Sequence, residues 1–340
     1  MSSLHVGILG ATGYTGVELI KLLSNHPSAT LSFVSSQTYS GKKMSEVFGE
    51  LKCVCDDVLL SPEEAIKQTV DCVFSCLPHA TSAGLCKPFI DKGIRVVDLS
   101  ADFRIKDPKA YAQWYKTEHP CPQLLKKAVF GLPEHYRSAI AQASLLANPG
   151  CYSSSIMLPL IPLYKERAAR ITGVIADSKS GVSGAGRSLK LSSLFVEAHE
   201  NFIAYSIGRA HRHLAEIDQE LSFACGKKVE ITFSPHLAPI NRGILSTIYI
   251  NGQLSSEECL EIIKRAYKDE PFIRVRDPGD LPSVRDVAYT NFCDIGIAGG
   301  GSGQPVIVVC AIDNLLKGAS GQALQNMNIM FGFKETTALQ

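Results

Sequence analysis

The chain lacks any large excess of charge of one sign. Its 340 residues include 34 Lys and Arg and 33 Asp and Glu, so the formal net charge at pH 7 is +1. A near-neutral chain has no global field that would hold nucleic acid or an anionic membrane, so neither partner is expected. The length suits two domains of ordinary size better than one large core.

A disulfide or zinc framework is also missing. The eleven cysteines form no CxxC pair and are too sparse for a small disulfide-stapled scaffold. No pair of histidines follows them at zinc-finger spacing, so no metal is expected. Most of these thiols are therefore expected to be small, buried hydrophobic groups.

Targeting and membrane-spanning patterns are absent too. The N-terminus has no basic flank followed by an apolar segment, so no secretory signal is evident. No apolar run approaches the roughly 18–20 residues that a transmembrane helix needs. We therefore expect a cytoplasmic protein with reduced thiols.

The first hundred residues alternate between strand and helix patterns. Short apolar runs predict buried strands, and helical spacing separates them; the predicted strands are 4–9, 31–34, 72–77 and 95–99, and the predicted helices 14–25, 61–69 and 81–92. This alternation predicts an α/β fold with a doubly wound parallel sheet of the Rossmann type.

The pattern changes after residue 148. A helix interrupted by Pro159 and Pro162 is predicted at 154–166, and strands with longer connections at 173–178, 229–235, 243–250 and 306–311. This favours a second, α+β domain with a mostly antiparallel sheet. We expect residues 1–148, completed by a C-terminal helix within 314–340, to form the dinucleotide-binding domain, and 149–313 to form a catalytic and oligomerisation domain.

A glycine-rich turn joins the first predicted strand to the first helix. It comprises Gly10, Ala11, Thr12, Gly13, Tyr14, Thr15 and Gly16. Glycines at such a turn let the backbone approach a pyrophosphate, and the helix N-terminus offers N–H groups and a partial positive charge. The spacing is GxxGxxG rather than GxGxxG, so a purely structural turn is the alternative.

The end of the second strand lacks the acidic residue that usually grips the ribose of NAD. Ser36 and Gln37 stand there, and Lys42 and Lys43 follow. Small hydroxyls and nearby cations suit an additional 2′-phosphate, so we infer NADP rather than NAD. The alternative for the two lysines is a solvated loop.

One cysteine is set apart by its local sequence. Cys151 follows Asn148, Pro149 and Gly150, a sharp turn, and a helix is predicted just beyond it. A helix N-terminus stabilises a thiolate, lowers its pKa and presents N–H groups to an oxyanion. Cys151 is therefore the candidate nucleophile, and the other ten cysteines are interpreted as packing residues.

A thiolate needs a partner that moves protons. His211 and His213 open a helical stretch in which Glu216 follows, and the carboxylate could orient either ring. A nucleophilic thiol beside a nicotinamide cofactor indicates one reaction class: the thiol forms a thioester, and hydride moves between the cofactor and that carbon.

Ordered motifs along nearly the whole chain resemble the N-acetyl-gamma-glutamyl-phosphate reductases and, more distantly, aspartate-semialdehyde dehydrogenases. The motifs are GATGYTG at 10–16, LPH at 77–79, DLSADFR at 98–104, GLPE at 131–134, NPGCY at 148–152, DSKSGVSGAGR at 177–187, HRH at 211–213, SPHL at 234–237, RG at 242–243 and DNLLKG at 313–318.

The resemblance implies NADPH-dependent reduction of N-acetyl-glutamyl 5-phosphate to N-acetyl-glutamate 5-semialdehyde and phosphate, in arginine biosynthesis. It implies Cys151 as nucleophile and His211 as the preferred proton donor and acceptor, with His213 as runner-up. Cofactor contacts implied beyond the glycine turn are Ser36, Gln37, Leu77, Pro78, Ser180, Gly181, Gly184 and Asn314. Substrate contacts implied are Arg104, Asn148, Lys179, Arg187 and Arg242, although each cation could instead form an ordinary ion pair.

The chain departs from the family pattern at three places. Ser153 and Ser154 replace the usual Pro-Thr, Gln37 replaces an Arg in the second-strand motif, and Ala215 replaces a Pro before Glu216. None of these changes removes a group that the chemistry requires, but the residue holding the 2′-phosphate stays open.

Three other functions remain open from the sequence. The same chemistry could act on an aminoadipyl, aspartyl or carrier-linked acyl phosphate, since the cations do not set substrate length. A nonphosphorylating aldehyde dehydrogenase is disfavoured, and a noncatalytic NADP-sensing regulator would not need Cys151 and the histidines. A homo-oligomer, dimer or tetramer, is expected because the second sheet could pair across a two-fold axis.

Overall fold

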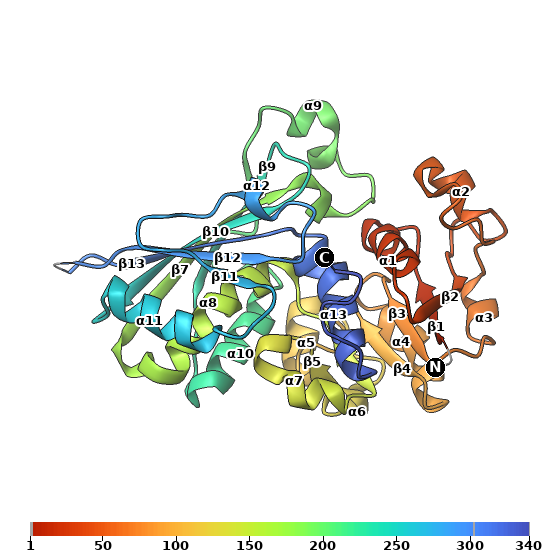
Figure 1. The fold of residues 1–340 in the computed structure, drawn as a ribbon, viewed down its shortest axis with the longest axis horizontal. Helices are drawn as coiled ribbons and strands as arrows, with labels where there is room; N and C mark the ends of the chain where they lie inside the picture. Colours follow the sequence, from red (N-terminus) through yellow and green to blue (C-terminus); the bar gives the residue numbers. More distant parts are fainter. Residues whose placement is uncertain (1–2, 302, 340) are drawn as a thin grey trace. The chain divides into compact units, whose positions relative to one another are not determined.

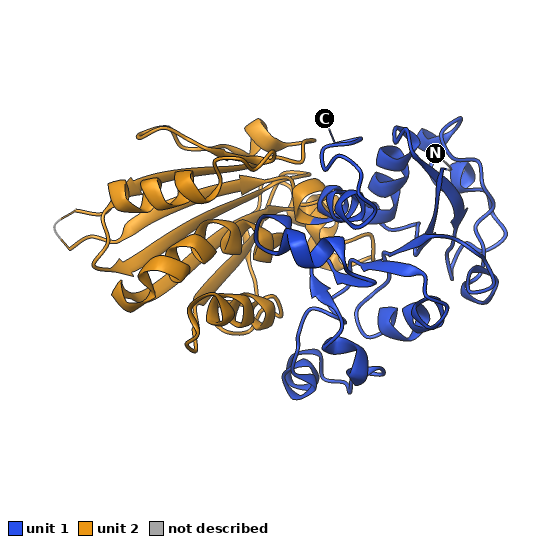
Figure 2. Cartoon of the chain, turned by 60° about the horizontal axis from the view of Figure 1, so that its bottom comes forward, with its two compact units in different colours: residues 1–149, 319–340 blue, residues 150–318 orange. Residues whose placement is uncertain are grey.

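The computed structural model describes residues 3–301 and 303–339, and the chain forms two compact units (Figure 2). The first comprises Met1–Pro149 and Ala319–Gln340, and the second Gly150–Gly318. Residues 314–318 thus group with the second unit, whereas the sequence pattern assigned them to the C-terminal helix of the first.

The first unit is built on a six-stranded sheet in the order β2-β1-β3-β4-β6-β5 (Figure 1). All neighbouring strands are parallel. The strands are β1 (Leu4–Leu9), β2 (Ala29–Val34), β3 (Cys72–Ser75), β4 (Arg95–Asp98), β5 (Val129–Phe130) and β6 (Leu145–Ala147). This is the doubly wound parallel sheet that the alternating pattern predicted.

Helices of the first unit cover both faces of this sheet. They are α1 (Tyr14–Ser24), α2 (Met44–Val47), α3 (Pro62–Ala65), α4 (Ser82–Asp91), α5 (Pro108–Tyr115), α6 (Pro122–Leu125), α7 (Pro133–Ala141) and α13 (Gly321–Met330). Helix α13 packs against α1, α7 and β4, while α4 packs against β3 and β4. Val73, Val96 and Leu145 face the α4 side, and their strand neighbours Phe74 and Val97 are equally buried on the other.

The second unit contains a seven-stranded mixed sheet in the order β11-β12-β13-β10-β7-β9-β8. The strands are β7 (Ile171–Gly181), β8 (Ile203–Ala204), β9 (Thr232–Ala238), β10 (Ile244–Gly252), β11 (Ile273–Val275), β12 (Cys293–Gly299) and β13 (Val306–Ile312). The pairs β7–β9 and β11–β12 are parallel, and the other four are antiparallel. The expectation of a mostly antiparallel sheet is confirmed.

Three long helices of the second unit pack together against its sheet. The helices of this unit are α8 (Cys151–Arg167), α9 (Phe195–Ala198), α10 (Leu214–Cys225), α11 (Ser256–Ala266) and α12 (Val284–Val287). Helix α8 contacts β7, β10 and β13 and lies between α10 and α11. The residues of α8 from Tyr152 to Tyr164 are all buried, so this helix is surrounded by protein.

Several element boundaries differ from the sequence prediction. Helix α8 begins three residues before the predicted start and continues through Pro159 and Pro162. Helix α3 is only Pro62–Ala65, and residues 316–320 form a π turn before α13 begins at Gly321. The prediction omitted the short strands β5, β6, β8 and β11 and the longer strand β12, in which Gly296 weakens the strand pattern. A Cβ at Gly296 would lie 2.8 Å from the Asp280 carbonyl oxygen, so packing there requires a residue that weakens the strand pattern.

Among the described residues, no helix is both long and apolar enough to cross a membrane. Within the same residues, no group of three or more His, Cys, Asp or Glu side chains is placed to hold a metal ion. All eleven cysteines are free thiols.

Candidate active site

Cys151 is the first residue of helix α8, as the Pro-Gly turn indicated, and its side chain is partly exposed. Gly150 is the N-cap, with extended backbone angles (φ −72°, ψ 155°). The first N–H groups of a helix have no partner within the helix, and the N-terminus carries a partial positive charge. This position favours the thiolate and can bind an oxyanion beside it.

His213 and Glu216 both lie against the N-cap of α8. The buried Glu216 carboxylate accepts a hydrogen bond from the Gly150 N–H (3.2 Å). A Cβ built on Gly150 would lie 2.6 Å from His213 Nε2 and 2.7 Å from Glu216 Oε1. The imidazole and the carboxylate therefore occupy the space next to Gly150, one residue from the Cys151 thiol.

Helix α10 presents these two groups because it packs along α8. Its Leu214, Ile217 and Leu221 side chains are buried, which fixes the face of α10 that turns toward the protein. His213 is the N-cap residue of α10, so the predicted helix starts three residues after His211. The packing of α10 on α8 thus brings together Cys151 and Glu216, which lie far apart in the sequence.

His211 lies in a box of aromatic rings. Its ring meets Tyr152, Tyr205 and Phe233 edge-on, with ring centroids between 5.2 and 5.6 Å away, and His213 at 4.7 Å. Burial, and then the Arg212 charge, lower the pKa of His211 to about 4. His211 Nδ1 accepts the His213 backbone N–H (3.2 Å), so the neutral ring carries its proton on Nε2.

The rings of this box are tied to the sheet. Tyr205 donates its hydroxyl hydrogen to the Tyr152 hydroxyl (3.2 Å), which donates to the His236 carbonyl oxygen (3.1 Å). Burial raises the pKa of Tyr205 to about 12 and raises the pKa of Tyr152 as well, so both hydroxyls stay protonated at neutral pH. The Tyr and Phe rings that surround His211 are therefore all uncharged.

Gly318 closes the other side of the thiol. A Cβ on Gly318 would lie 2.8 Å from Cys151 Cβ, so the turn after β13 approaches Cys151 as closely as a backbone can. Gly318 N–H donates to the Asp313 carbonyl oxygen (2.9 Å). Two glycines, Gly150 and Gly318, thus leave room around the reactive position.

Asp313 organises the segment that leads to Gly318. It accepts two hydrogen bonds from the fork of Arg242 (2.9 and 3.1 Å) and two from the Leu315 and Leu316 N–H groups (2.8 and 3.1 Å). Arg242 and Asp313 are both buried. Arg242 therefore makes a buried ion pair, which is the structural alternative to the predicted substrate contact.

The predicted cofactor residues of the second unit form one cluster. Asn314 accepts the Gly243 N–H (2.7 Å) and donates to Ser183 Oγ (3.0 Å). A Cβ on Gly184 would meet Ser180 Oγ at 2.7 Å, and a Cβ on Gly181 would meet the Asn241 carbonyl oxygen at 2.5 Å. Ser180, Gly184 and Asn314 are therefore neighbours in the fold.

The other two predicted cations of this unit lie in different settings. Lys179 is partly exposed and pairs with Asp177 (2.6 Å), which also contacts His236 Nδ1 (3.2 Å). Arg187 is exposed, beyond the Gly184 cluster. Either charge can reach solvent, unlike that of Arg242.

In the first unit, the glycine turn has the geometry of a phosphate cradle. Gly10 has a positive φ of 72°, and a Cβ there would lie 2.8 Å from the Cys76 carbonyl oxygen and 3.1 Å from Leu77. Gly13 is the N-cap of α1. A Cβ on Gly16 would clash with the Ala11 backbone at 2.4 Å. The turn therefore requires glycine at Gly10 and Gly16, whereas Gly13 has an ordinary φ of −83° and space for a Cβ. The α1 N-terminus that follows the turn is a position that can bind a pyrophosphate.

The neighbouring cofactor candidates differ in exposure. Ser36 is buried and bonded to Thr12 Oγ1 (3.0 Å), whereas Gln37 is exposed. Leu77 and Pro78 follow β3 at the carboxyl end of the sheet, where ligands of doubly wound folds bind. These residues lie where a doubly wound unit can bind a dinucleotide.

Arg104 and Asn148, the substrate candidates of the first unit, are both buried. Arg104 donates to the carbonyl oxygens of Asn148 (2.7 Å) and Leu99 (2.8 Å). Asn148 accepts from Asn326 (3.1 Å) and donates to the Ala319 carbonyl oxygen (3.1 Å). Both are thus anchored within the first unit.

Sequence reasoning missed Tyr205, Asp313 and the role of the two glycines around Cys151. Asp313 belongs to the DNLLKG motif, and the sequence could have identified it as a helix-capping residue. An Asp side chain commonly accepts the N–H groups two and three residues later at a helix start, as Asp313 does from Leu315 and Leu316. Tyr205 lies in no local pattern, and only the fold brings it to His211.

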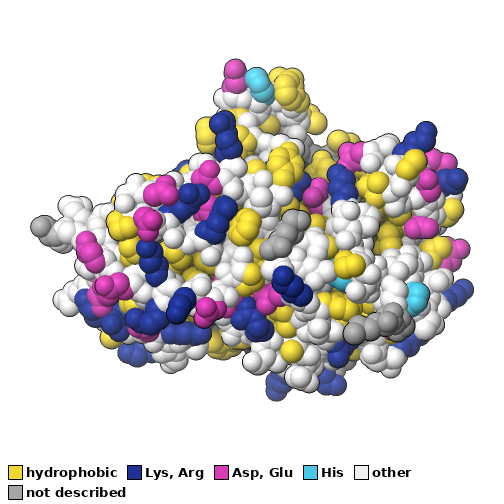
Figure 3. Space-filling model, in the orientation of Figure 1, with side chains coloured by type: hydrophobic (Ala, Val, Ile, Leu, Met, Phe, Trp, Pro, Cys, Tyr) yellow, Lys and Arg dark blue, Asp and Glu magenta, His cyan; other side chains and the backbone are white. Residues whose placement is uncertain are grey.

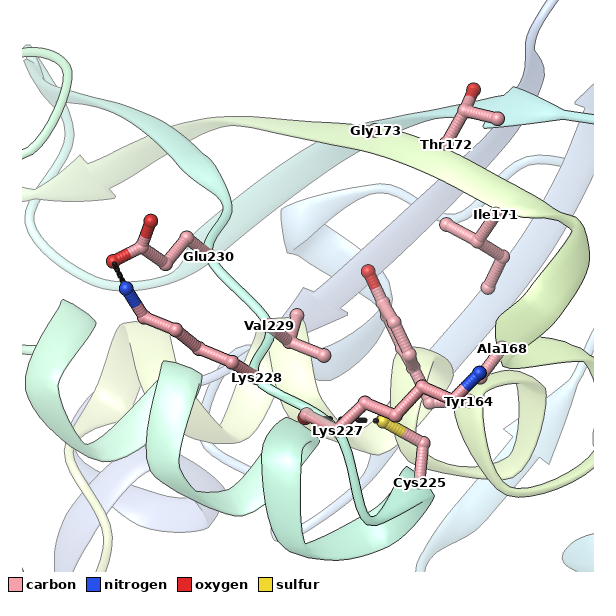
Figure 4. Close-up of a pocket in the computed structure, with 10 residues that line it drawn as sticks. All are labelled: Tyr164, Ala168, Ile171, Thr172, Gly173, Cys225, Lys227, Lys228, Val229 and Glu230. Carbon is pink, nitrogen blue, oxygen red and sulfur yellow. Dashed lines mark hydrogen bonds and ion pairs between the residues drawn. The ribbon is translucent and has the colours of Figure 1, made fainter.

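A separate cavity of about 260 Å³ opens at the other end of α8 and α10 (Figure 4). Its walls include Tyr164, Cys225, Lys227 and Glu230, all from the second unit. Lys228 there pairs with Glu230 (3.0 Å). None of the predicted site residues lines this cavity.

Comparisons with known proteins match a family model to each of the two units. Residues 5–143 match the family model described as semialdehyde dehydrogenase, NAD binding domain, and residues 151–314 match semialdehyde dehydrogenase, dimerisation domain. Aspartate semialdehyde dehydrogenase II from Vibrio cholerae, solved with ASA, has a TM-score of 0.72 at 16% identity and covers 98% of this chain and 99% of its own. The Candida albicans enzyme solved with NADP has a TM-score of 0.68 at 17% identity, covering 97% and 99%.

A dinucleotide-binding unit followed by a unit that carries a thiol at a helix N-terminus places the chain in the semialdehyde dehydrogenase class. Two relatives identify the family within this class. The N-acetyl-gamma-glutamyl-phosphate reductase of Geobacter metallireducens is 48% identical over 340 residues, covering 99% of this chain and 98% of the relative. That of Magnetococcus marinus is 48% identical over 341 residues, covering 99% and 97%. The chain belongs to the N-acetyl-gamma-glutamyl-phosphate reductase family.

Proposed function

We propose that the chain catalyses the NADPH-dependent reduction of N-acetyl-L-glutamyl 5-phosphate to N-acetyl-L-glutamate 5-semialdehyde and phosphate, as a step of arginine biosynthesis. The observation that carries the proposal is the thiol of Cys151 at the α8 N-terminus beside His213 and Glu216. The full-length likeness to reductases of this name supports the substrate.

In this mechanism the Cys151 thiolate attacks the acyl carbon, the C–O bond to phosphate breaks, and phosphate leaves with the electron pair. A thioester on Cys151 results. The nicotinamide cofactor, when bound, supplies the hydride that reduces this acyl group. The N–H groups at the α8 N-terminus stabilise the oxyanion left by hydride transfer, and His213 donates a proton to it. His213 then takes this proton back as the C=O bond re-forms and the C–S bond breaks, so the aldehyde leaves and the Cys151 thiolate is restored.

The geometry favours His213 over His211 as the residue that moves protons. His213 Nε2 lies at Gly150, one residue from the thiol, with Glu216 beside it. His211 is enclosed by aromatic rings, and its lowered pKa keeps it neutral. His211 acts instead as a positioning residue, because its Nδ1 accepts the His213 N–H and so holds the turn that presents His213.

Two variants separate these roles. In His211→Asn the amide oxygen can still accept the His213 N–H, whereas His213→Gln removes the titrating group. We expect His213→Gln to lower kcat by about 10²–10⁴-fold and to remove a limb from the pH profile of kcat/KM. His211→Asn should lose less activity and keep the profile. The reverse pattern would assign proton transfer to His211.

The proposal places the dinucleotide on the first unit at Gly10–Gly16, Ser36, Gln37, Leu77 and Pro78. The other cofactor contacts that the family resemblance implies, Ser180, Gly181, Gly184 and Asn314, form a cluster within the second unit. The absence of an acidic residue at Ser36 and Gln37 supports NADP. Comparing KM values for NADP and NAD tests this choice, and a lower KM for NAD would refute it.

Substrate charge is proposed to be met by the partly exposed Lys179 and the exposed Arg187, whose side chains reach solvent. Arg104, Asn148 and Arg242 are engaged in buried contacts. The proposal gives these three a structural role, Arg104 and Asn148 in the first unit and Arg242 in the second. A rise in KM for Arg187→Gln, with kcat preserved, would support direct binding.

The decisive experiment is phosphate-dependent reduction of NADP with a panel of N-acetyl-glutamate, aspartate and aminoadipate semialdehydes. We expect the first to be preferred, and preference for another would transfer the same chemistry to that acyl chain. Cys151→Ser should abolish turnover while NADPH binding persists, and Cys225→Ser, another partly exposed thiol of the second unit, is the matched control. Intact NADPH binding without wild-type turnover on any substrate would favour a regulator.

We also propose that the protein is a cytoplasmic homo-oligomer. The match of residues 151–314 to a dimerisation domain supports the homo-oligomer. Sedimentation of the wild-type chain measures the oligomeric state directly.

A further inference from the structure

The second unit carries an unusual concentration of exposed apolar side chains. We call residues 189–207 the arm; it contains α9 and β8. Of fifteen large apolar side chains exposed in the described part of the chain, seven lie in the arm, including Leu189 (92% exposed), Phe195 (77%) and Val196 (82%). Figure 3 shows hydrophobic side chains gathered on the projection around α9. Such clustering is typical of a docking surface rather than of a free monomer surface.

The arm has almost no core of its own. Between residues 189 and 202, Ala198 is the one buried residue in the structure. The contacts within this stretch are local, such as Asn201 to the Glu197 carbonyl oxygen (2.9 Å) and the Phe195 ring against His199 (4.9 Å). Its connection to the sheet consists of the short strand β8 on β9 and of the Tyr205 N–H, which donates to the Pro235 carbonyl oxygen of β9 (3.2 Å). The arm therefore needs an external surface to bury its apolar side chains.

The end of the arm belongs to the candidate active site. Tyr205 lies within the arm, packs against His211 (5.6 Å) and donates to the Tyr152 hydroxyl. His211 in turn holds the His213 N–H. Anything that orders the arm will therefore also order the turn that presents His213 to Gly150.

We propose that a second copy of this chain docks on the arm, and that this contact stabilises the Tyr205–His211 packing required for activity. The proposal rests on the homo-oligomer proposed above. The whole arm lies within residues 151–314, the segment that matches a dimerisation domain. Its charged side chains are few and of mixed sign, namely Lys190, Glu197 and Glu200, which suits a protein partner better than a nucleic acid or an anionic membrane surface.

The test compares a double variant, Phe195→Ser with Val196→Ser, to the single variant Phe223→Ser. Phe223 is exposed on α10 in the same unit but outside the arm, so it is the matched control. Sedimentation and specific activity are measured from nanomolar to micromolar protein. The arm variant should dissociate at a concentration at least about tenfold higher than wild type, and its activity should fall with the oligomer fraction and recover at higher concentration.

The outcomes separate the two proposals. A wild type that is monomeric and active at every concentration would refute the homo-oligomer itself. An oligomeric wild type with unchanged association of the arm variant would refute the arm alone, and a monomeric variant with full activity would refute the link to the site. If the variant fails to fold, hydrogen exchange of the wild type decides: protection of residues 189–202 should fall on dilution, and protection that persists in the monomer would show that the same chain covers the arm.

Discussion

Replacing Gly150 with Ala tests whether the imidazole beside the thiol matters. Gly150 has φ −72° and ψ 155°, which alanine adopts without strain, so the backbone should tolerate the change. The added Cβ, however, would lie 2.6 Å from His213 Nε2 and 2.7 Å from Glu216 Oε1. The nearest groups to the new methyl group are therefore these two side chains.

The magnitude follows from that distance. Ordinary van der Waals contacts begin at 3.4 Å, so His213 must move by about 0.8 Å to accommodate the methyl group. A displacement of about 1 Å in a catalytic group can lower the rate by about 100-fold. We expect a loss of roughly 30- to 100-fold in kcat, which corresponds to about 2–3 kcal/mol in the activation free energy.

Two assays detect the change. Phosphate-dependent NADP reduction gives kcat, and alkylation by iodoacetamide, followed by mass spectrometry of the Cys151 peptide, reports the reactivity of the thiol itself. Gly84→Ala is the control, because Gly84 lies in α4 with no heavy atom within 4 Å of the added Cβ. Alanine should be as good as glycine there or better.

A stable Gly150→Ala protein with wild-type kcat and wild-type alkylation rates would refute the reasoning. It would show that the contact of His213 and Glu216 with the N-cap is packing without catalytic consequence. A protein that loses kcat but keeps its alkylation rate would instead limit His213 to steps after the thiol attack.

Three further predictions concern single side chains. Ser153→Ala should raise the free energy of unfolding by about 1 kcal/mol in urea denaturation, because the Ser153 hydroxyl is buried without a hydrogen-bond partner; a loss of stability would contradict this. Gly318→Ala should slow Cys151 alkylation, because the new methyl group would press on Cys151 Cβ at 2.8 Å; an unchanged rate would show that the turn yields. Burial, and then the Asp102 charge, raise the pKa of Asp98 to about 6, so the folded state binds this proton more tightly than the unfolded chain. The stability contributed by Asp98 is then greatest below about pH 4 and falls as pH rises through 6, by about 3 kcal/mol. The pH profile of the free energy of unfolding should therefore diverge from that of Asp98→Asn across this window, and parallel profiles would count against it.

Much of the fold could be predicted because its signals are local. The buried runs of the first unit and the glycine turn at Gly10 follow from spacing and from backbone constraints that neighbouring residues reveal. Cys151 could be placed at a helix start for the same reason. Strand β12 and the continuous helix α8 could not, because Gly296 and the prolines of α8 are tolerated only by tertiary packing.

The candidate site was predictable in its residue types but not in its geometry. Sequence spacing places His211 and His213 equally near a helix start and cannot tell which ring approaches the thiol. That choice depends on how α10 packs along α8 and on the rings of Tyr205 and Phe233, which come from distant segments. The sequence favoured His211 for proton transfer, but in the structure aromatic rings enclose its side chain.

The eleven thiols are distinguished by two opposing physical effects. Burial raises the pKa of Cys55 to about 11 and the pKa of Cys72, Cys76 and Cys259 to about 12, so these thiols remain protonated at neutral pH. Cys151 is partly exposed at a helix N-terminus, where partial positive charge favours the anion. A nucleophilic thiol must be accessible, and its thiolate must be stabilised. Exposure alone, away from a helix N-terminus, does not stabilise the thiolate. The backbone around Cys151 therefore distinguishes it from the other thiols. Gly150 leaves space for His213 and Glu216 beside it, and Gly318 leaves space around the Cys151 side chain itself, where a Cβ would clash.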